Sequence, residues 1–181
     1  MKEKEIFRPF AETAFALKNL INNLDEQFKT NPNKSIEKLI DQQIKAMKHL
    51  LDRSIRVTGD FVPVHASKKA IEYCEVNELG DIFKIGWGNQ AKFEKQLNRK
   101  TCQLKHEHKI TVNDQITKIK KANNVEEVLG IFLTQEIVWV LKSEDALLPK
   151  SRRENHDQAY KDAGIEIVKN PYQSGHLFVN K

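Results

Sequence analysis

The densest group of residues that could carry out chemistry is Lys105-His106-Glu107-His108-Lys109. On an extended segment, side chains two residues apart project to the same face, so His106 and His108 would lie together while Glu107 points away. Two imidazoles on one face of a positively charged segment could bind a divalent metal or polarise a water molecule beside a phosphodiester. The alternative is a pair of surface histidines in a lysine-rich turn.

The order of acid, histidine, loop and helix in this segment resembles the beginning of the HNH or ββα-metal nuclease motif. The resemblance implies that His108 is the base that activates water and that Glu107 helps to hold a metal ion. His106 and Asp114 are the further candidate metal ligands, and Asn113 or Asp114 would orient the reacting groups. The metal expected at such a site is Mg²⁺ or Mn²⁺, since these hard cations suit carboxylate and phosphate oxygens.

Other features depart from that motif or from other catalytic patterns. No cysteine pairs frame the segment, and only the distant Asn155 or His156 could supply the residue that the motif places on a following helix. The chain contains no GxGxxG and no GxxxxGK[ST], so no nucleotide cofactor is expected. Asp81 and Glu166 are each followed by a lysine three positions later, which on a strand places acid and lysine on opposite faces.

Positive charge is concentrated in the basic segment, residues 84–121. It holds ten Lys or Arg and three Asp or Glu, a net charge of +7, whereas the whole chain carries +5 and the remainder therefore −2. Such an uneven distribution is typical of a surface that faces a polyanion. The alternative is a solvated lysine-rich face with no partner.

Nucleic acid is the polyanion that we expect, DNA or RNA. Adjacent arginines can hold a phosphate bidentately, and a tryptophan between two glycines can stack on a base. The candidate nucleic-acid-binding residues are Lys105, Lys109, Lys118, Lys120, Lys121, Arg152, Arg153 and Trp87.

The first fifty residues predict two amphipathic helices joined at Asn31-Pro32. Pro9 is expected in the first turn of the first helix, where its missing N–H costs nothing. The second helix carries a broad apolar stripe, more than one face wide: Ile36, Leu39, Ile40, Ile44, Met47, Leu50 and Leu51. One flank of the stripe is expected to pack on the core and the other on a partner helix, which predicts a homodimer.

The rest of the chain predicts a mixture of short helices and strands. Residues 81–88 and 104–112 are expected to be extended, Asn113 is expected to cap a helix, and 136–141 and 165–168 are expected to be strands. The predicted fold is therefore α+β and helix-dominated, with an N-terminal helical hairpin (1–53) packed on a small sheet in an α+β body (54–181).

Cys74 and Cys102 are the only cysteines, too few for a disulfide framework or a paired-cysteine metal knuckle. Cys74 is expected to be a small buried apolar residue. No window approaches 18 consecutive apolar residues, and the charged beginning of the chain does not resemble a signal peptide. A cytoplasmic location is therefore the expectation.

These patterns predict a nucleic-acid-binding protein, with a metal-dependent nuclease of the HNH kind as an extension of that function. The alternative is a non-enzymatic interaction protein, such as a dimeric regulator or inhibitor of a nucleic-acid enzyme.

Overall fold

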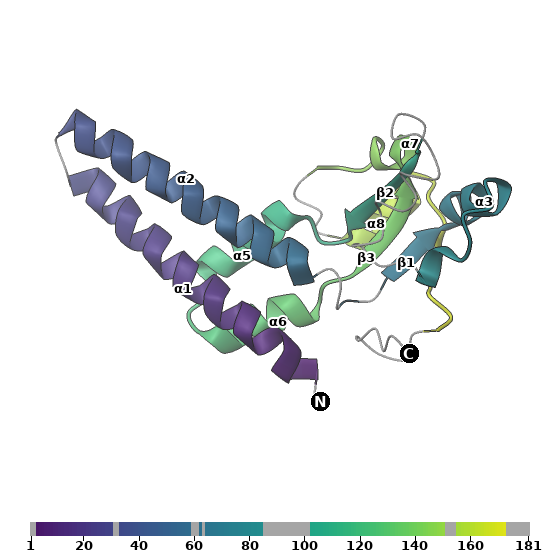
Figure 1. The fold of residues 1–181 in the computed structure, drawn as a ribbon, viewed down its shortest axis with the longest axis horizontal. Helices are drawn as coiled ribbons and strands as arrows, with labels where there is room; N and C mark the ends of the chain where they lie inside the picture. The colour runs from purple at the N-terminus through teal and green to yellow at the C-terminus, as the bar shows by residue number, and fades with distance from the viewer. Residues whose placement is uncertain are drawn as a thin grey trace. The chain divides into compact units, whose positions relative to one another are not determined.

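The structure is a computed structural model that describes residues 3–30, 33–58, 62, 64–84, 102–150 and 155–172. The chain divides into two compact units (Figure 1). The hairpin unit comprises residues 1–58 and 115–134, and the sheet unit comprises residues 59–114 and 135–181. The predicted boundary between residues 53 and 54 stays a prediction.

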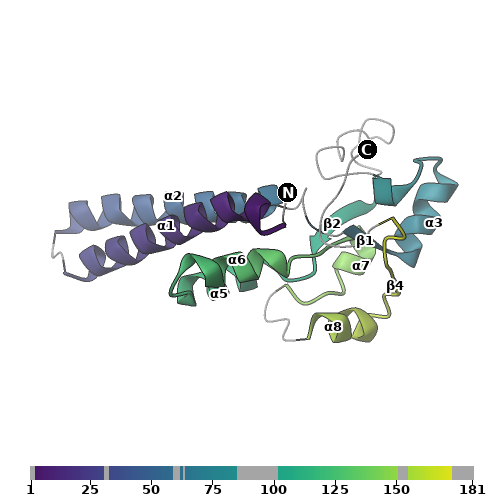
Figure 2. The same ribbon diagram turned by 90° about the horizontal axis from the view of Figure 1, so that it is seen from below.

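The hairpin unit is built on two long helices that lie side by side, α1 (Glu3–Thr30) and α2 (Lys34–Val57). Asn33 caps α2, because its side chain accepts a hydrogen bond from the backbone N–H of Ser35. Helix α6 (Val125–Leu133) packs against α1, and α5 (Val112–Lys121) and α6 lie along the same side of the hairpin (Figure 2). The apolar core of the unit includes Phe7, Ala14, Ile21, Ile44, Leu51, Ile55, Val128 and Phe132.

Two helix starts differ from the sequence prediction. Helix α1 begins at Glu3, so Pro9 lies inside the helix rather than in its first turn. Helix α5 (Val112–Lys121) begins before Asn113. Its start is capped by Thr111, whose hydroxyl accepts from the backbone N–H of Asp114 at 3.1 Å and donates to the Asp114 carboxylate at 2.7 Å. The Thr111 hydroxyl therefore caps the helix, whereas the sequence predicted that Asn113 would cap it.

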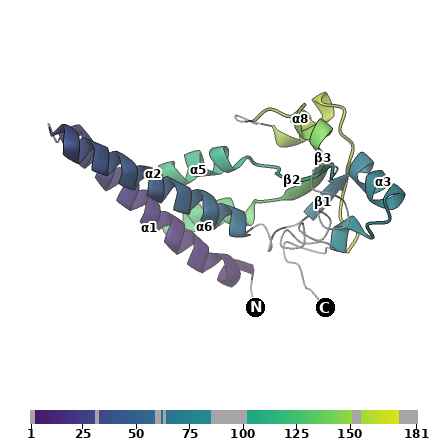
Figure 3. The same cartoon turned by 45° about the horizontal axis from the view of Figure 1, so that its top comes forward.

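The sheet unit contains a four-stranded mixed sheet with the order β2-β3-β1-β4. Figure 3 shows the first three of these strands side by side. The strands are β1 (Val64–Ser67), β2 (Leu104–His108), β3 (Ile137–Leu141) and β4 (Ile167–Val168). Strand β1 is parallel to β3, while β2 is antiparallel to β3 and β4 is antiparallel to β1. The near-continuous apolar sequence of β3 fits its central position, where both faces are buried.

One face of the sheet forms an apolar cluster with the C-terminal part of the chain. Val138 and Val140 of β3 pack with Leu148, Ile165 and Tyr160, the last of these on α8 (His156–Asp162).

A buried hydrogen bond joins two short helices of the sheet unit. Its donor, the Ser67 hydroxyl, lies at the start of α3 (Lys68–Val76) and is 2.6 Å from the carboxylate of Glu144 on α7 (Lys142–Asp145).

The predicted fold class is confirmed: the protein has a helix-dominated α+β fold with an N-terminal helical hairpin and a small sheet. The prediction of an extended segment at 81–88 is wrong over its described part, because Ile82–Lys84 is a 3₁₀ turn. There the Asp81 carboxylate accepts the backbone N–H of Phe83 at 3.0 Å, a local bond that competes with strand pairing.

Two smaller expectations concern burial and membrane spanning. Cys74 is buried, as expected, and burial raises the pKa of its thiol to about 12, so it is not a thiolate at neutral pH. No helix within the described ranges is long and apolar enough to cross a lipid bilayer.

Candidate functional site

The two histidines lie on one face of β2, as their spacing predicts. Leu104, His106 and His108 are buried, whereas Lys105 and Glu107 between them are partly exposed on the other face. His106 and His108 are each only 6% exposed. They are therefore not the surface pair of the alternative interpretation.

His106 packs into the interior of the sheet unit. Its ring meets the fully buried ring of Trp139 edge-on, with centroids 4.7 Å apart, and the two residues are cross-strand partners. Burial, with a smaller contribution from neighbouring His108, lowers the pKa of His106 well below its ordinary value. His106 is consequently a neutral, aromatic core residue at physiological pH.

The expected metal ligands are not brought together in the described part of the chain. Glu107 lies on the opposite face of β2 from His106 and His108. Asp114 accepts the hydroxyl of Thr111 at the start of α5. Among the described residues, no group of three or more His, Cys, Asp or Glu side chains is placed to hold a metal ion. The predicted metal site thus gains no support from these residues.

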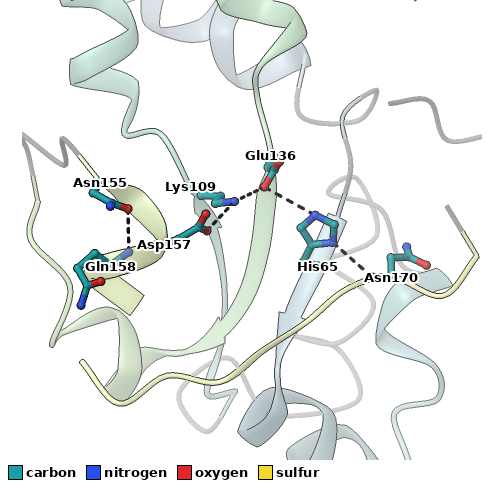
Figure 4. A network of polar contacts seen from close by, with 7 residues as sticks. All are labelled: His65, Lys109, Glu136, Asn155, Asp157, Gln158 and Asn170. Atoms are coloured by element: carbon teal, nitrogen blue, oxygen red, sulfur yellow. Dashed lines mark hydrogen bonds and ion pairs between the residues drawn. The ribbon is translucent and has the colours of Figure 1, made fainter. Parts of the chain in front are cut away.

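A different polar cluster lies where β2 ends and β3 begins (Figure 4). The ammonium of Lys109 is 2.6 Å from the carboxylate of Glu136 and 2.9 Å from that of Asp157 on α8. The Lys109 side chain is 22% exposed. Burial alone would lower the pKa of Lys109, but its two carboxylate partners outweigh that effect and raise it. The hydrogen bond from Lys109 lowers the pKa of Asp157. We call Lys109, Glu136, Asp157 and His65 the lysine network.

His65 on β1 completes the lysine network. Its Nε2 is 3.7 Å from the Glu136 carboxylate, and its Nδ1 accepts the backbone N–H of Asn170 at 3.3 Å. An Nδ1 that accepts a hydrogen bond leaves the proton of the neutral ring on Nε2, facing Glu136. Burial lowers the pKa of His65, and Lys109 and Lys169 act in the same direction, whereas Glu136 opposes them. The ring is therefore neutral near pH 7, with both nitrogens facing protein groups.

The lysine network joins β1, the ends of β2 and β3, and α8. Its side chains face one another (Figure 4), and a backbone bond from Lys109 N–H to the Glu136 carbonyl, 3.0 Å long, reinforces the same junction. The arrangement can hold charge in place and fix the position of α8. The sequence did not indicate Glu136, Asp157 or His65 as site residues. The antiparallel pairing of His108 with Ile137 places Lys109 beside Glu136, and this pairing is visible only in the structure.

Several of the predicted nucleic-acid-binding cations have carboxylate partners. Lys105 forms an ion pair with Asp145, which Lys150 also contacts at 2.8 Å. Burial opposes ionisation of Asp145, but the two lysines outweigh it and lower the pKa of that carboxyl. Lys109 belongs to the lysine network. The charge of both predicted lysines is thus partly neutralised within the fold.

Lys118, Lys120 and Lys121 differ from Lys105 and Lys109 in exposure and in ion pairing. They lie in the last turn of α5, all three are exposed, and none of them takes part in an ion pair among the described residues. The remaining candidates, Trp87, Arg152 and Arg153, lie outside the described residues.

Comparison of the chain with protein families, curated proteins and solved structures found no match.

Proposed function

We propose that this protein binds nucleic acid through the lysine cluster of α5, which consists of Lys118, Lys120 and Lys121. The observation that carries the proposal is the net charge of +7 on residues 84–121 together with the exposure of this cluster. Two of the three are adjacent in sequence, so a single phosphate backbone can be contacted by several ammonium groups. Lysines near a helix C-terminus also offset the helix dipole, and the experiment below separates the two roles.

The proposal predicts a strong salt dependence of binding. Affinity for a DNA or RNA duplex should fall steeply with salt, because each neutralised phosphate releases condensed counterions. Replacing Lys118, Lys120 and Lys121 together by Ala is expected to reduce the log–log salt slope by about 2–3, since each lost phosphate contact contributes about 0.9. Fluorescence anisotropy between low and physiological salt measures both slopes.

The matched control is the triple variant Lys34→Ala, Lys38→Ala and Lys48→Ala. It removes the same charge from exposed positions of α2, outside the basic segment. Its slope should stay at the wild-type value. Equal reductions in both variants would mean that binding follows net charge alone, and a wild-type slope near zero would end the proposal.

Hydrolysis would be a further step, and it has its own test. Wild-type protein is incubated with DNA or RNA and Mg²⁺ or Mn²⁺, beside a His108→Ala variant. Cleavage that requires both the metal and His108 would support the nuclease extension. Binding without cleavage by the wild type restricts the function to binding, and cleavage retained in His108→Ala removes that histidine from the mechanism.

A second candidate function is that of a non-enzymatic interaction protein. It is favoured by the exposed apolar side chains on the hairpin, among them Leu39, Leu50 and Val57. Absence of any salt-dependent nucleic-acid binding, combined with stable self-association, would favour this candidate.

A further inference from the structure

Helix α2 carries two apolar stripes, of which only one is covered. Ile40, Ile44, Leu51 and Ile55 are buried in the hairpin unit. The second stripe is exposed to solvent: Ile36 at 40%, Leu39 at 59%, Leu50 at 49% and Val57 at 51%. Large apolar side chains that are exposed in a row, rather than singly, mark an interaction surface. Helix α1 also has two exposed large apolar side chains, Leu20 at 50% and Phe28 at 41%.

The spacing of the exposed stripe is that of a coiled coil. Ile36, Gln43, Leu50 and Val57 recur every seven residues, and Leu39, Ala46 and Arg53 each follow three residues after one of them. Alternating steps of three and four are the a and d positions of a heptad repeat, sustained here over three heptads. We call these seven exposed residues the α2 seam. Such a repeat fits the face of another helix, not a polyanion or an extended peptide.

The α2 seam is almost free of charge. Arg53 is its one charged residue, although 30% of the whole chain is charged. The charged groups of α2 that are ion-paired lie off the seam, as in the pairs Lys45–Asp41 and Arg56–Asp52. An uncharged surface does not repel an identical surface, and it offers nothing to a partner that would be selected by charge. This favours a second copy of the same chain as the occupant.

We propose that two copies of this protein associate through the α2 seam, with the two α2 helices antiparallel around a two-fold axis near Ala46. Ala46 lies at the middle of the seam, where its small side chain lets the helices approach. Reversal about this residue sets Ile36 within one residue of the partner's Val57. A symmetric pair of this kind closes on itself and buries the same surface on both copies.

The position of Arg53 favours the antiparallel arrangement. In a parallel pair the two Arg53 side chains would face each other in one layer. In the antiparallel pair each Arg53 lies level with the partner's Leu39, and the two guanidinium layers are about 20 Å apart at 1.5 Å per residue. A separation of that size, beyond the Debye length at physiological salt, removes most of the repulsion.

The size of the surface is sufficient for a weak dimer. The seam from Ile36 to Val57 is about 31 Å long at 1.5 Å per residue. A helix is about 12 Å wide with its side chains, so the seam covers about 370 Å² on each copy and about 740 Å² in total. That is smaller than a standard stable interface, so we expect a weak dimer with a dissociation constant of about 10 µM. The seam residues are exposed in the single chain, so α5 and α6 do not cover them, and the proposal is independent of nucleic-acid binding.

The test uses the full chain in analytical ultracentrifugation. Wild-type protein is expected to be dimeric at tens of micromolar, and Leu39→Glu with Leu50→Glu is expected to weaken dimerisation at least 100-fold. Both side chains are about half exposed in the single chain, so the variant should keep its wild-type circular dichroism. The matched control is Val76→Glu with Leu147→Glu, at apolar residues exposed by 83% and 64% outside the hairpin unit, and it should remain dimeric.

Cysteine cross-linking tests the orientation. Ala46→Cys should form a disulfide between copies, because Ala46 lies beside the axis, whereas Ile36→Cys should not, because its two copies would lie at opposite ends of the seam. The native Cys74 and Cys102 are buried. A monomeric wild type at 100 µM, or a dimer that survives both glutamates, overturns the proposal. Cross-linking of Ile36→Cys as efficiently as Ala46→Cys overturns the antiparallel arrangement.

Discussion

Lys109→Met is expected to lower the free energy of unfolding by about 2–4 kcal/mol, since it removes the cation that two carboxylates share. The Lys109 ammonium lies 2.6 Å from Glu136 and 2.9 Å from Asp157, and the side chain is only 22% exposed. Methionine keeps most of the aliphatic stem, so the loss measures the ammonium and not the packing of the stem. Urea denaturation followed by circular dichroism gives the difference.

Two further variants separate the contributions within the lysine network. Asp157 is 73% exposed, so Asp157→Asn should cost less than about 1 kcal/mol, as exposed ion pairs do. The double variant Lys109→Met with Glu136→Gln should be more stable than Lys109→Met alone, because no partly buried carboxylate is left without its cation. An unchanged denaturation midpoint in Lys109→Met would show that the network contributes nothing to stability.

The Lys109→Met variant also distinguishes two roles of Lys109, nucleic-acid binding and ion pairing within the fold. The sequence analysis assigned Lys109 to nucleic-acid binding, whereas the structure pairs it with Glu136 and Asp157. If the lysine is structural, folded Lys109→Met should keep the wild-type salt slope for nucleic acid. A slope reduced by about 0.9 would instead return Lys109 to the binding surface.

The sequence predicted what depends on local patterns. The amphipathic helices of the hairpin, an apolar strand at 136–141 and the common face of His106 and His108 all follow from local patterns. The structure confirms them, with the strand at Ile137–Leu141. The split of the α2 stripe into a covered and an uncovered flank was also foreseen, because a stripe wider than one face cannot be covered by one neighbour. Which residues belong to each flank required the structure.

The sequence could not predict what depends on pairing between distant segments. His65 is 44 positions before Lys109 and 71 positions before Glu136 in the sequence, yet the three residues meet in the lysine network. That meeting is set by the parallel pairing of β1 with β3 and the antiparallel pairing of β2 with β3, neither of which leaves a local signal. The sequence could not predict the burial of His106 for the same reason, because that burial depends on Trp139 in the neighbouring strand.

Acidification is expected to destabilise the protein as the pH falls through about 6.5, well above the range in which carboxylates titrate. Burial lowers the pKa of both His65 and His106 in the folded state. Below the ordinary histidine pKa of about 6.5 the unfolded chain therefore binds protons that the folded chain does not, and the free energy of unfolding decreases. Each such histidine contributes up to about 1.4 kcal/mol per pH unit. Between pH 7.5 and 5.5 we expect a loss of about 1.5–2.5 kcal/mol from the pair.

The variants that test this acid sensitivity keep the shape of each site. His106→Phe retains an aromatic ring against Trp139 but cannot take up a proton, and His65→Asn removes the second titrating ring. Together they should flatten the change in urea midpoint between pH 7.5 and 5.5, whereas His49→Gln, at an exposed position of α2, should leave it intact. Asp145 and Asp157, whose carboxyl pKa values are lowered, lose their contribution only in more acidic solution, so they do not confuse the measurement. A wild-type midpoint that is constant from pH 7.5 to 5.5 would mean that neither histidine is held neutral by the fold.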